Sequence, residues 1–137
     1  MIQIVCGTKG KGKTKVLLEK ANEIAKSSNG ITVYLDKNSK HSFELNSLAR
    51  LIDISEYPVK SYDSFVGFVS GILSGNHDID TIFFDSFLTI ASIDADNLEN
   101  AVNTLLKIDN TCNYFLSISL DEKEIPESLK QYITVSL

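Results

Sequence analysis

The stretch GTKGKGKT, residues 7–14, matches the pattern G-x-x-x-x-G-K-[ST] at every fixed position. Its glycines let the backbone turn and let N–H groups point inward at an anion, where a side chain would clash. The apolar run Ile2–Val5 precedes the stretch, and the residues from Thr14 onward have the periodicity of an amphipathic helix. Strand, loop and helix follow one another as the motif requires. The stretch is therefore interpreted as a phosphate-binding P-loop.

The residue types in the loop indicate which groups they contact. We expect the Lys13 ammonium to reach the β- and γ-phosphates of a nucleoside triphosphate and to act in catalysis, and the Thr14 hydroxyl to ligate Mg²⁺. Lys9 and Lys11 are interpreted equally well as attracting phosphate or as projecting into solvent. The cofactors expected are ATP and Mg²⁺. The expected nucleotide-binding residues are Gly7, Thr8, Lys9, Gly10, Lys11, Gly12, Lys13, Thr14 and Lys15.

A carboxylate follows a second buried strand. The strand Thr81–Phe84 is hydrophobic, and Asp85 comes directly after it. This is the arrangement of a Walker B acid, which holds Mg²⁺ beside the P-loop. The alternative is an aspartate at an ordinary turn. Because a P-loop lies upstream, the metal role is favoured, and Thr14 with Asp85 is predicted as the metal-binding pair.

The residues for hydrolysis are less complete. The position after Asp85 holds Ser86, where many ATPases carry a glutamate that polarises the attacking water. Asp36 follows the strand Ile31–Leu35 and is the candidate catalytic carboxylate, positioning a water or a substrate at the same edge of the sheet. Its alternative is a solvated turn aspartate. Arg50 is the only arginine and precedes a predicted strand, so a stabilising arginine would have to come from a partner protein.

Other polar residues have two interpretations. Ser117 and Ser119, at the end of a predicted strand, either sense the γ-phosphate or are ordinary strand serines. His41 and His77 lie in polar loops and are interpreted as uninvolved.

Hydrophobic periodicity alternates between strands and helices, which indicates a parallel sheet covered on both faces. Gly30 is expected to end the first helix in the left-handed conformation, and Asp96 with Glu99 to form a capping box. The pattern predicts one α/β domain over residues 1–137, a three-layer P-loop NTPase fold with a mostly parallel sheet of about five strands. The order of its elements resembles a RecA-like core. Predicted strands cover residues 2–5, 31–35, 51–54, 81–84, 114–118 and 133–135, and predicted helices follow the loop and cover residues 62–73, 96–105 and 127–131.

Composition limits the partners. The chain of 137 residues has a net charge of −5, whereas nucleic-acid binders usually carry a basic face. Its one local excess of lysine lies in the phosphate loop, so no nucleic acid is expected. No apolar run approaches the length of a membrane span, and Met1–Val5 already has the pattern of a strand rather than a signal peptide. Cys6 and Cys112 have no disulfide or metal spacing, which favours a cytoplasmic location. The oligomeric state stays open.

The chain resembles, over nearly its whole length, a group of small stand-alone bacterial P-loop proteins of unknown role, some catalogued under the name of the twitching-motility retraction ATPase. The resemblance implies nucleotide binding but not motility, because the retraction ATPase is far longer and carries histidine and acidic boxes that are absent here. The order of elements also resembles thymidine kinase, but the glutamate after Asp85 and the cysteine zinc site are missing. The segments that carry the resemblance are 7–14, 51–53, 56–57, 62–68, 71–76, 82–85, 119–122 and 125–126.

Two hypotheses of different class follow. The first is a slow NTPase that binds Mg·ATP and serves a partner protein, which supplies a residue in trans. The second is a nucleotide-sensing module without appreciable turnover. A kinase of a small metabolite is a third, weaker alternative.

Overall fold

A computed structural model describes all residues, 1–137. It contains a six-stranded sheet in which every neighbouring pair of strands is parallel, in the order β3-β2-β4-β5-β1-β6. The predicted mostly parallel sheet is confirmed, with six strands rather than about five because both edge segments pair with it. The strands are β1 (Ile2–Cys6), β2 (Ile31–Asp36), β3 (Ala49–Asp53), β4 (Ile79–Phe84), β5 (Asn113–Ile118) and β6 (Ile133–Ser136).

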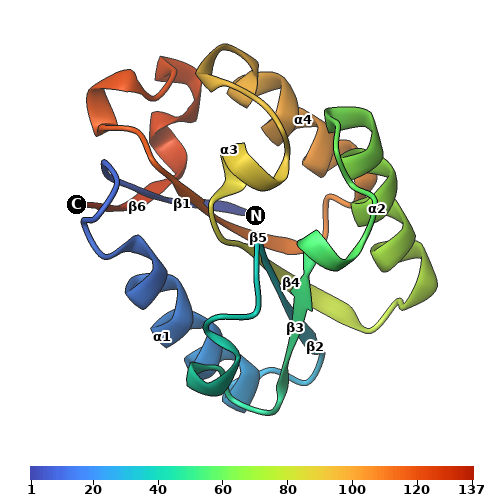
Figure 1. Cartoon of the computed structure of the whole chain (residues 1–137). Coiled ribbons are helices and arrows are strands. Elements are labelled where there is room, and N and C mark those ends of the chain that lie inside the picture. Colours follow the sequence, from blue (N-terminus) through green and yellow to red (C-terminus); the bar gives the residue numbers. More distant parts are fainter.

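Helices cover both faces of this sheet, as the alternating pattern predicts. Helix α1 (Lys13–Ser27) lies alone on one face, and α2 (Tyr62–Gly75), α3 (Phe87–Ile90) and α4 (Leu98–Ile108) lie on the other (Figure 1). The three-layer α/β fold is therefore confirmed. The structure adds several short elements that were not predicted: helix α3, shortly after Asp85, and 3₁₀ turns at 42–44, 54–56, 95–97 and 122–124. The predicted helix 127–131 is a 3₁₀ helix, Glu127–Tyr132. No helix is both long and apolar enough to cross a membrane.

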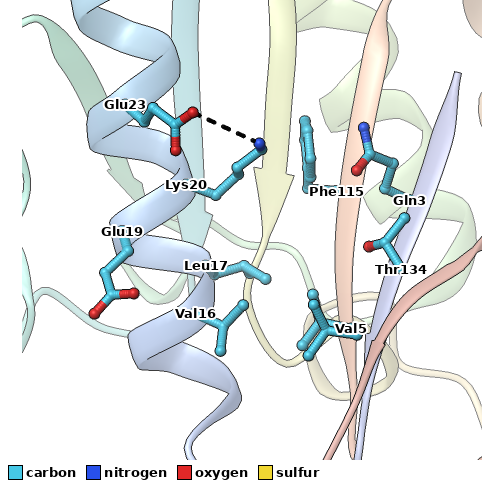
Figure 2. Close-up of a pocket in the computed structure, with 10 residues that line it drawn as sticks. Gln3, Val5, Val16, Leu17, Glu19, Lys20, Glu23, Phe115 and Thr134 are labelled. Atoms are coloured by element: carbon cyan, nitrogen blue, oxygen red, sulfur yellow. Dashed lines mark ion pairs between the residues drawn. The ribbon is translucent and has the colours of Figure 1, made fainter.

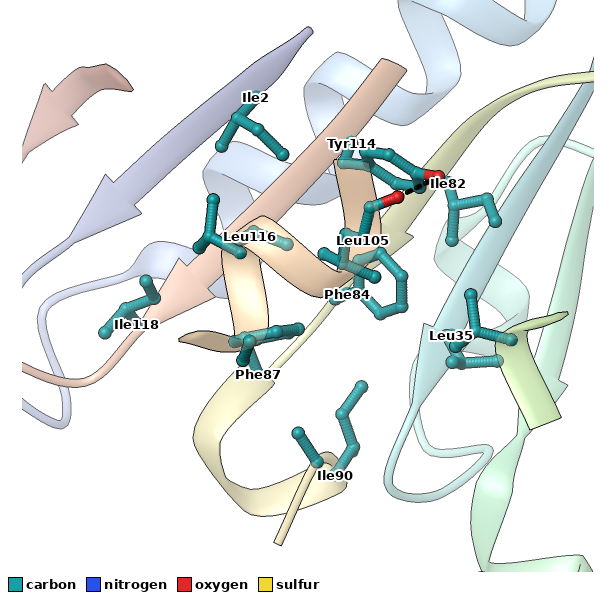
Figure 3. Packing of buried hydrophobic residues seen from close by; sticks show 14 of the residues in the cluster. Ile2, Leu35, Ile82, Phe84, Phe87, Ile90, Leu105, Tyr114, Leu116 and Ile118 are labelled. Atoms are coloured by element: carbon teal, nitrogen blue, oxygen red, sulfur yellow. Dashed lines mark hydrogen bonds between the residues drawn. The ribbon is translucent and has the colours of Figure 1, made fainter. Parts of the chain in front are cut away.

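The four inner strands β1, β2, β4 and β5 are mostly buried, because their successive side chains point to opposite faces and helices cover both faces. Tyr34, Phe83 and Phe115 face α1 and pack with its Leu17 and Ala21. The opposite face holds the larger cluster, in which alternate strand residues pack against α2, α3 and α4 (Figure 3). Labelled members of this cluster are Ile2, Leu35, Ile82, Phe84, Phe87, Ile90, Leu105, Tyr114, Leu116 and Ile118.

The expected conformation of Gly30 is wrong. Helix α1 ends at Ser27 with Ser28 in an extended conformation, and Gly30 is not among the residues with positive φ. Gly30 is instead required for space, because a Cβ there would lie 2.8 Å from the Asp78 backbone carbonyl oxygen and 2.3 Å from the Asp80 Oδ2 atom of strand β4. Ser28 donates to the same oxygen at 2.5 Å, which holds the carboxylate against the turn.

The expected capping box at Asp96 and Glu99 is also wrong. Residues Ala95–Asn97 form a 3₁₀ turn, so α4 begins at Leu98 with Asn97 at its N-cap position and without a side-chain cap. The turn moves the helix start beyond Asp96, and Glu99 is then too close to the cap to complete the box.

The topology brings distant segments to one edge. In parallel strands the carboxyl ends lie on the same side, so the loops after β1, β2, β4 and β5 meet there. Strand β5 lies between β1 and β4, and β2 lies on the other side of β4. The predicted P-loop, Asp36, Asp85 and Ser117 are consequently gathered at this edge.

Candidate functional site

The loop after β1 has the backbone of an anion cradle. Gly10 and Gly12 have φ values of 88° and 94°, in the left-handed region that side chains rarely adopt. Nothing lies within 4 Å of a Cβ built at either position, so the conformation and not the available space requires glycine. Helix α1 begins at Lys13 without a side-chain cap and without an acidic residue in its first turn. Its free N–H groups and positive dipole end are therefore open to an anion.

Lys13 lies folded across the loop. Its Nζ donates to the Thr8 carbonyl oxygen at 3.1 Å, and the residue is 8% exposed. Burial lowers the pKa of Lys13, while the negative charge of Asp85 opposes that shift. A partly desolvated ammonium with one hydrogen bond retains two N–H donors for an anion in the loop.

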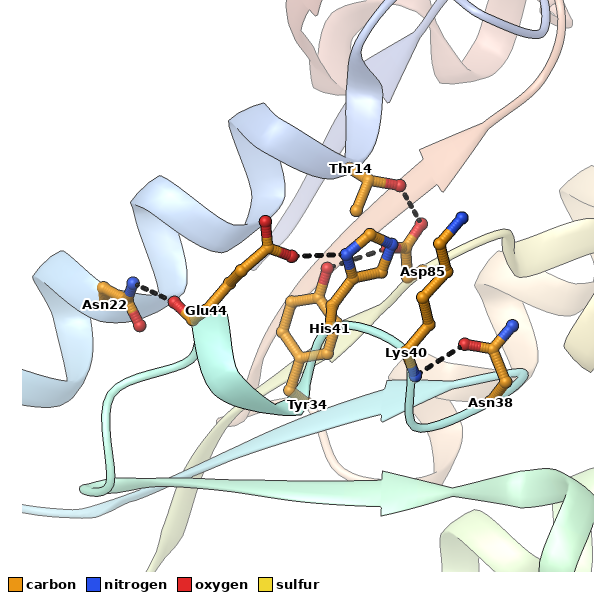
Figure 4. Close-up of polar contacts among 8 residues, drawn as sticks. All are labelled: Thr14, Asn22, Tyr34, Asn38, Lys40, His41, Glu44 and Asp85. Atoms are coloured by element: carbon orange, nitrogen blue, oxygen red, sulfur yellow. Dashed lines mark hydrogen bonds and ion pairs between the residues drawn. The ribbon is translucent and has the colours of Figure 1, made fainter.

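The structure brings Thr14 and Asp85 together across 71 residues. The Thr14 hydroxyl donates to Asp85 Oδ1 at 3.2 Å. Tyr34 donates to Oδ2 at 2.8 Å (Figure 4). Ser117 donates to Oδ1, the same oxygen that Thr14 contacts, at 2.9 Å. Three hydroxyls thus hold a carboxylate that is 2% exposed, which offsets the cost of burying its charge.

Tyr34 was missed by the sequence analysis. Burial raises its pKa, and the charge of Asp85 raises it further, so its hydroxyl keeps its proton and serves as a donor. Its ring stacks on Phe83, which stacks on Phe115 with a centroid distance of 4.4 Å. The signal in the sequence is only a tyrosine within an apolar strand, and its link to Asp85 depends on the pairing of β2 with β4.

Ser117 supports the turn after Asp85. Its Oγ accepts from the Ser86 backbone N–H at 2.7 Å while donating to Asp85. Ser86 has φ 59°, a left-handed conformation that costs energy for a residue other than glycine. Ser117 is thus a strand serine whose side chain contacts the Asp85 carboxylate, while a contact of Ser117 or Ser119 with a γ-phosphate stays a prediction.

Asp36 is buried rather than solvated. The residue is 2% exposed, so the interpretation as a solvated turn aspartate is wrong. Its Oδ1 accepts from the Lys37 backbone N–H at 2.7 Å, and its Oδ2 is buried without a partner. Burial raises the pKa of Asp36 to about 6, with a contribution from the charge of Asp85. An unpaired buried acceptor is costly, and it is suited to hold a water or a substrate hydroxyl.

Two polar cavities adjoin these groups, and no hydrophobic residue lines either of them. The first, about 190 Å³, lies in front of the P-loop, and the second, about 140 Å³, lies beside Asp36. They share Thr14, Lys37, Asp85 and Ser86. The first is lined further by Lys9, Gly10, Gly12, Lys13, Ser117 and Ser119, and the second by Asp36, Asn38, Lys40 and His41.

The remaining candidates lie around these cavities. Lys15 lines a neighbouring groove together with His41 and Glu44. Lys11 is exposed, and Gly7 donates its N–H to the Leu120 carbonyl oxygen at 2.9 Å. Asn22 of α1 donates to the carbonyl oxygen of Glu44, and the Glu44 carboxylate contacts His41, so the loop after β2 is attached to α1 (Figure 4). Lys37 and His41 were missed as cavity residues, because their position depends on how this loop folds back.

A larger groove, about 360 Å³, lies elsewhere. It runs between α1 and strands β1, β5 and β6, and Lys20 pairs with Glu23 on its α1 side (Figure 2). Its apolar lining includes Val5, Val16 and Phe115. None of the predicted site residues lines it.

Metal-binding capacity is limited to few side chains. No cluster of three or more His, Cys, Asp and Glu side chains is arranged to hold a metal ion. Thr14 and Asp85 supply a hydroxyl and a carboxylate, the oxygen donors that Mg²⁺ accepts together with phosphates and water. These residues fit Mg²⁺ that arrives with a phosphate ligand, and they do not form an all-protein cage.

Comparisons with known proteins agree with this architecture. No family model matches the chain, and a search of curated proteins finds no match. Among solved structures, the chain is similar to the flagellar accessory protein FlaH from Methanocaldococcus jannaschii, with a TM-score of 0.63 and 17% identity over 95% of this chain and 65% of that one. A weaker similarity, with a TM-score of 0.30 and 14% identity, covers 85% of this chain and 41% of the AMPPCP-bound DnaA from Aquifex aeolicus. The match covers a little less than two thirds of the length of FlaH, and it shows that the two proteins share a fold.

Proposed function

We propose that this protein binds a nucleoside triphosphate, Mg·ATP in the first place, and hydrolyses it slowly. The observation that carries the proposal is the contact between Thr14 and Asp85, 3.2 Å long, at the entrance of the glycine loop. It joins a hydroxyl and a carboxylate, which are donors for Mg²⁺, beside N–H groups and an ammonium, which are donors for phosphate.

Each part of the site has a role in this proposal. The N–H groups from Gly10 to Thr14 surround the phosphates, and Lys13 turns from the Thr8 carbonyl oxygen to a β- or γ-phosphate oxygen. Thr14 and Asp85 hold Mg²⁺, which neutralises charge on the phosphates when bound. Tyr34 and Ser117 keep the Asp85 carboxylate oriented through hydrogen bonds of 2.8 and 2.9 Å.

Slow hydrolysis is expected because few of the residues around the proposed phosphate site can assist the reaction. Asp36 is the carboxylate available to orient the attacking water, because it lines a polar cavity together with Thr14 and Asp85. Arg50 lies on the edge strand β3 and lines neither polar cavity. We therefore propose that a partner protein supplies an arginine, which in comparable systems accelerates the reaction by roughly 10³ to 10⁵.

The second candidate is transfer of the phosphoryl group to a small acceptor. The polar cavity of about 140 Å³ that Asp36 lines favours it, because a small acceptor with a hydroxyl group could enter there. A binding module without turnover would use the same phosphate contacts and would differ by releasing no phosphate.

The test is binding of Mg·ATP by calorimetry to the wild type, to Lys13→Ala and to Lys20→Ala. Lys20 is a matched control, since it is a lysine of the same helix whose contact is an ion pair with Glu23. We expect Lys13→Ala to weaken binding about tenfold or more, because it removes a charge-assisted contact to phosphate, while Lys20→Ala binds like the wild type. Equal affinity of all three proteins, or no binding by the wild type, would contradict the proposal.

A further inference from the structure

Lys37 is the cation that the two polar cavities share. It lines the cavity in front of the P-loop together with Lys13, and the cavity beside Asp36 together with Lys40. Lys9 and Lys13 line only the first of these, and Lys40 only the second. Lys37 thus lies where the space in front of the loop continues toward the candidate catalytic carboxylate.

The backbone of Lys37 is held in place. Its N–H donates to Asp36 Oδ1 at 2.7 Å, directly where strand β2 ends. The start of the side chain is therefore fixed at the sheet edge, beside the strand that carries Asp85. The exposed remainder is a long chain that can extend toward an anion.

Neither Lys37 nor Lys13 is held in an ion pair. None of the three ion pairs in the structure includes either of them, although the Asp85 carboxylate lines the same cavity. Both ammonium groups are therefore free to contact an anion that enters the cavity between them.

We propose that Lys37 binds the terminal phosphate of the nucleotide in cis, opposite Lys13, and so distinguishes a nucleoside triphosphate from a diphosphate. This inference rests on the proposed function. Lys13, Thr14 and Asp85 would contact the phosphates from the P-loop side, and Lys37 would contact the γ-phosphate from the side of Asp36. The one arginine, Arg50, lines neither cavity, so Lys37 would supply part of the positive charge that an arginine provides in comparable systems.

The experiment compares the affinities of Mg·ATP and Mg·ADP for the wild type, Lys37→Met, Lys37→Arg and Lys20→Met. We expect Lys37→Met to weaken ATP binding about tenfold, the value of one charge-assisted contact, and to leave ADP binding within about twofold. Lys37→Arg should keep the preference for ATP, because it retains the charge. Lys20→Met, which lies on helix α1 and lines neither polar cavity, should leave the ATP-to-ADP ratio unchanged.

The outcomes separate this inference from the proposed function. A wild type that binds neither nucleotide would contradict both. ATP binding that is unchanged in Lys37→Met, or that weakens in parallel with ADP binding, would overturn the role of Lys37 and leave nucleotide binding intact. Melting temperatures serve as the folding control, and we expect no change because the side chain of Lys37 is exposed.

Discussion

Substitution of Asp36 by asparagine tests whether the buried carboxylate lowers the free energy of unfolding of the protein without ligand. In the folded chain the pKa of Asp36 is raised from 3.8 to about 6, because burial and the charge of Asp85 disfavour its ionised form. The folded state therefore holds the Asp36 proton more tightly than the unfolded state does. Stability attributable to this group is greatest below about pH 4 and decreases as the pH rises toward 6.

The size of the effect follows from the two pKa values. A difference from 3.8 to about 6 corresponds to roughly 3 kcal/mol of unfolding free energy lost above pH 6. An asparagine side chain at this position would keep the shape and an oxygen that accepts from the Lys37 N–H. Its amide is neutral and can donate toward Asp85. We expect Asp36→Asn to be more stable than the wild type by about 1–3 kcal/mol at pH 7.5, with the gain disappearing near pH 4.

The assay is urea unfolding of both proteins at pH 4 and pH 7.5, with EDTA and without nucleotide, so that no metal compensates the charge. Asp96→Asn is the control, since Asp96 is exposed and makes no side-chain hydrogen bond. If Asp36→Asn is no more stable than the wild type at pH 7.5, or if its gain is the same at both pH values, the burial argument is refuted. The same variant should lose ATP turnover, because asparagine cannot take a proton from water.

Two further perturbations address the metal site and the fold. Removing Mg²⁺ should weaken ATP binding more in the wild type than in Asp85→Asn, because only the wild type keeps the carboxylate that holds the ion; an equal loss in both, measured by calorimetry, would make Asp85 a structural residue only. Gly30→Ala should destabilise the protein by about 1–3 kcal/mol in urea unfolding, because its Cβ would lie 2.3 Å from Asp80 Oδ2. The control is Gly71→Ala, because the space around the new methyl group is open. We expect this variant to stabilise helix α2 by up to about 1 kcal/mol. Equal stability of the two variants would contradict the steric argument at Gly30.

Local sequence was sufficient for the glycine loop after β1 and for most elements, while phosphate binding by that loop stays a prediction. The spacing of Gly7, Gly12, Lys13 and Thr14 is dictated by backbone conformation over a few residues, so it can be recognised without the fold. The apolar runs of the strands and the amphipathic period of α1 are equally local. The carboxylate Asp85 was identified because a polar residue directly after a buried strand is itself a local signal.

Tertiary structure decided which side chains meet. Tyr34 contacts Asp85 because β2 pairs with β4, and Ser117 does so because β5 lies between β1 and β4. The burial of Asp36, the shared position of Lys37 and the space limit at Gly30 depend likewise on neighbouring strands and on the folded loop. The strand order depends on the packing of both sheet faces against helices across the whole chain. The pattern of side chains within a single strand does not indicate which other strand pairs with it.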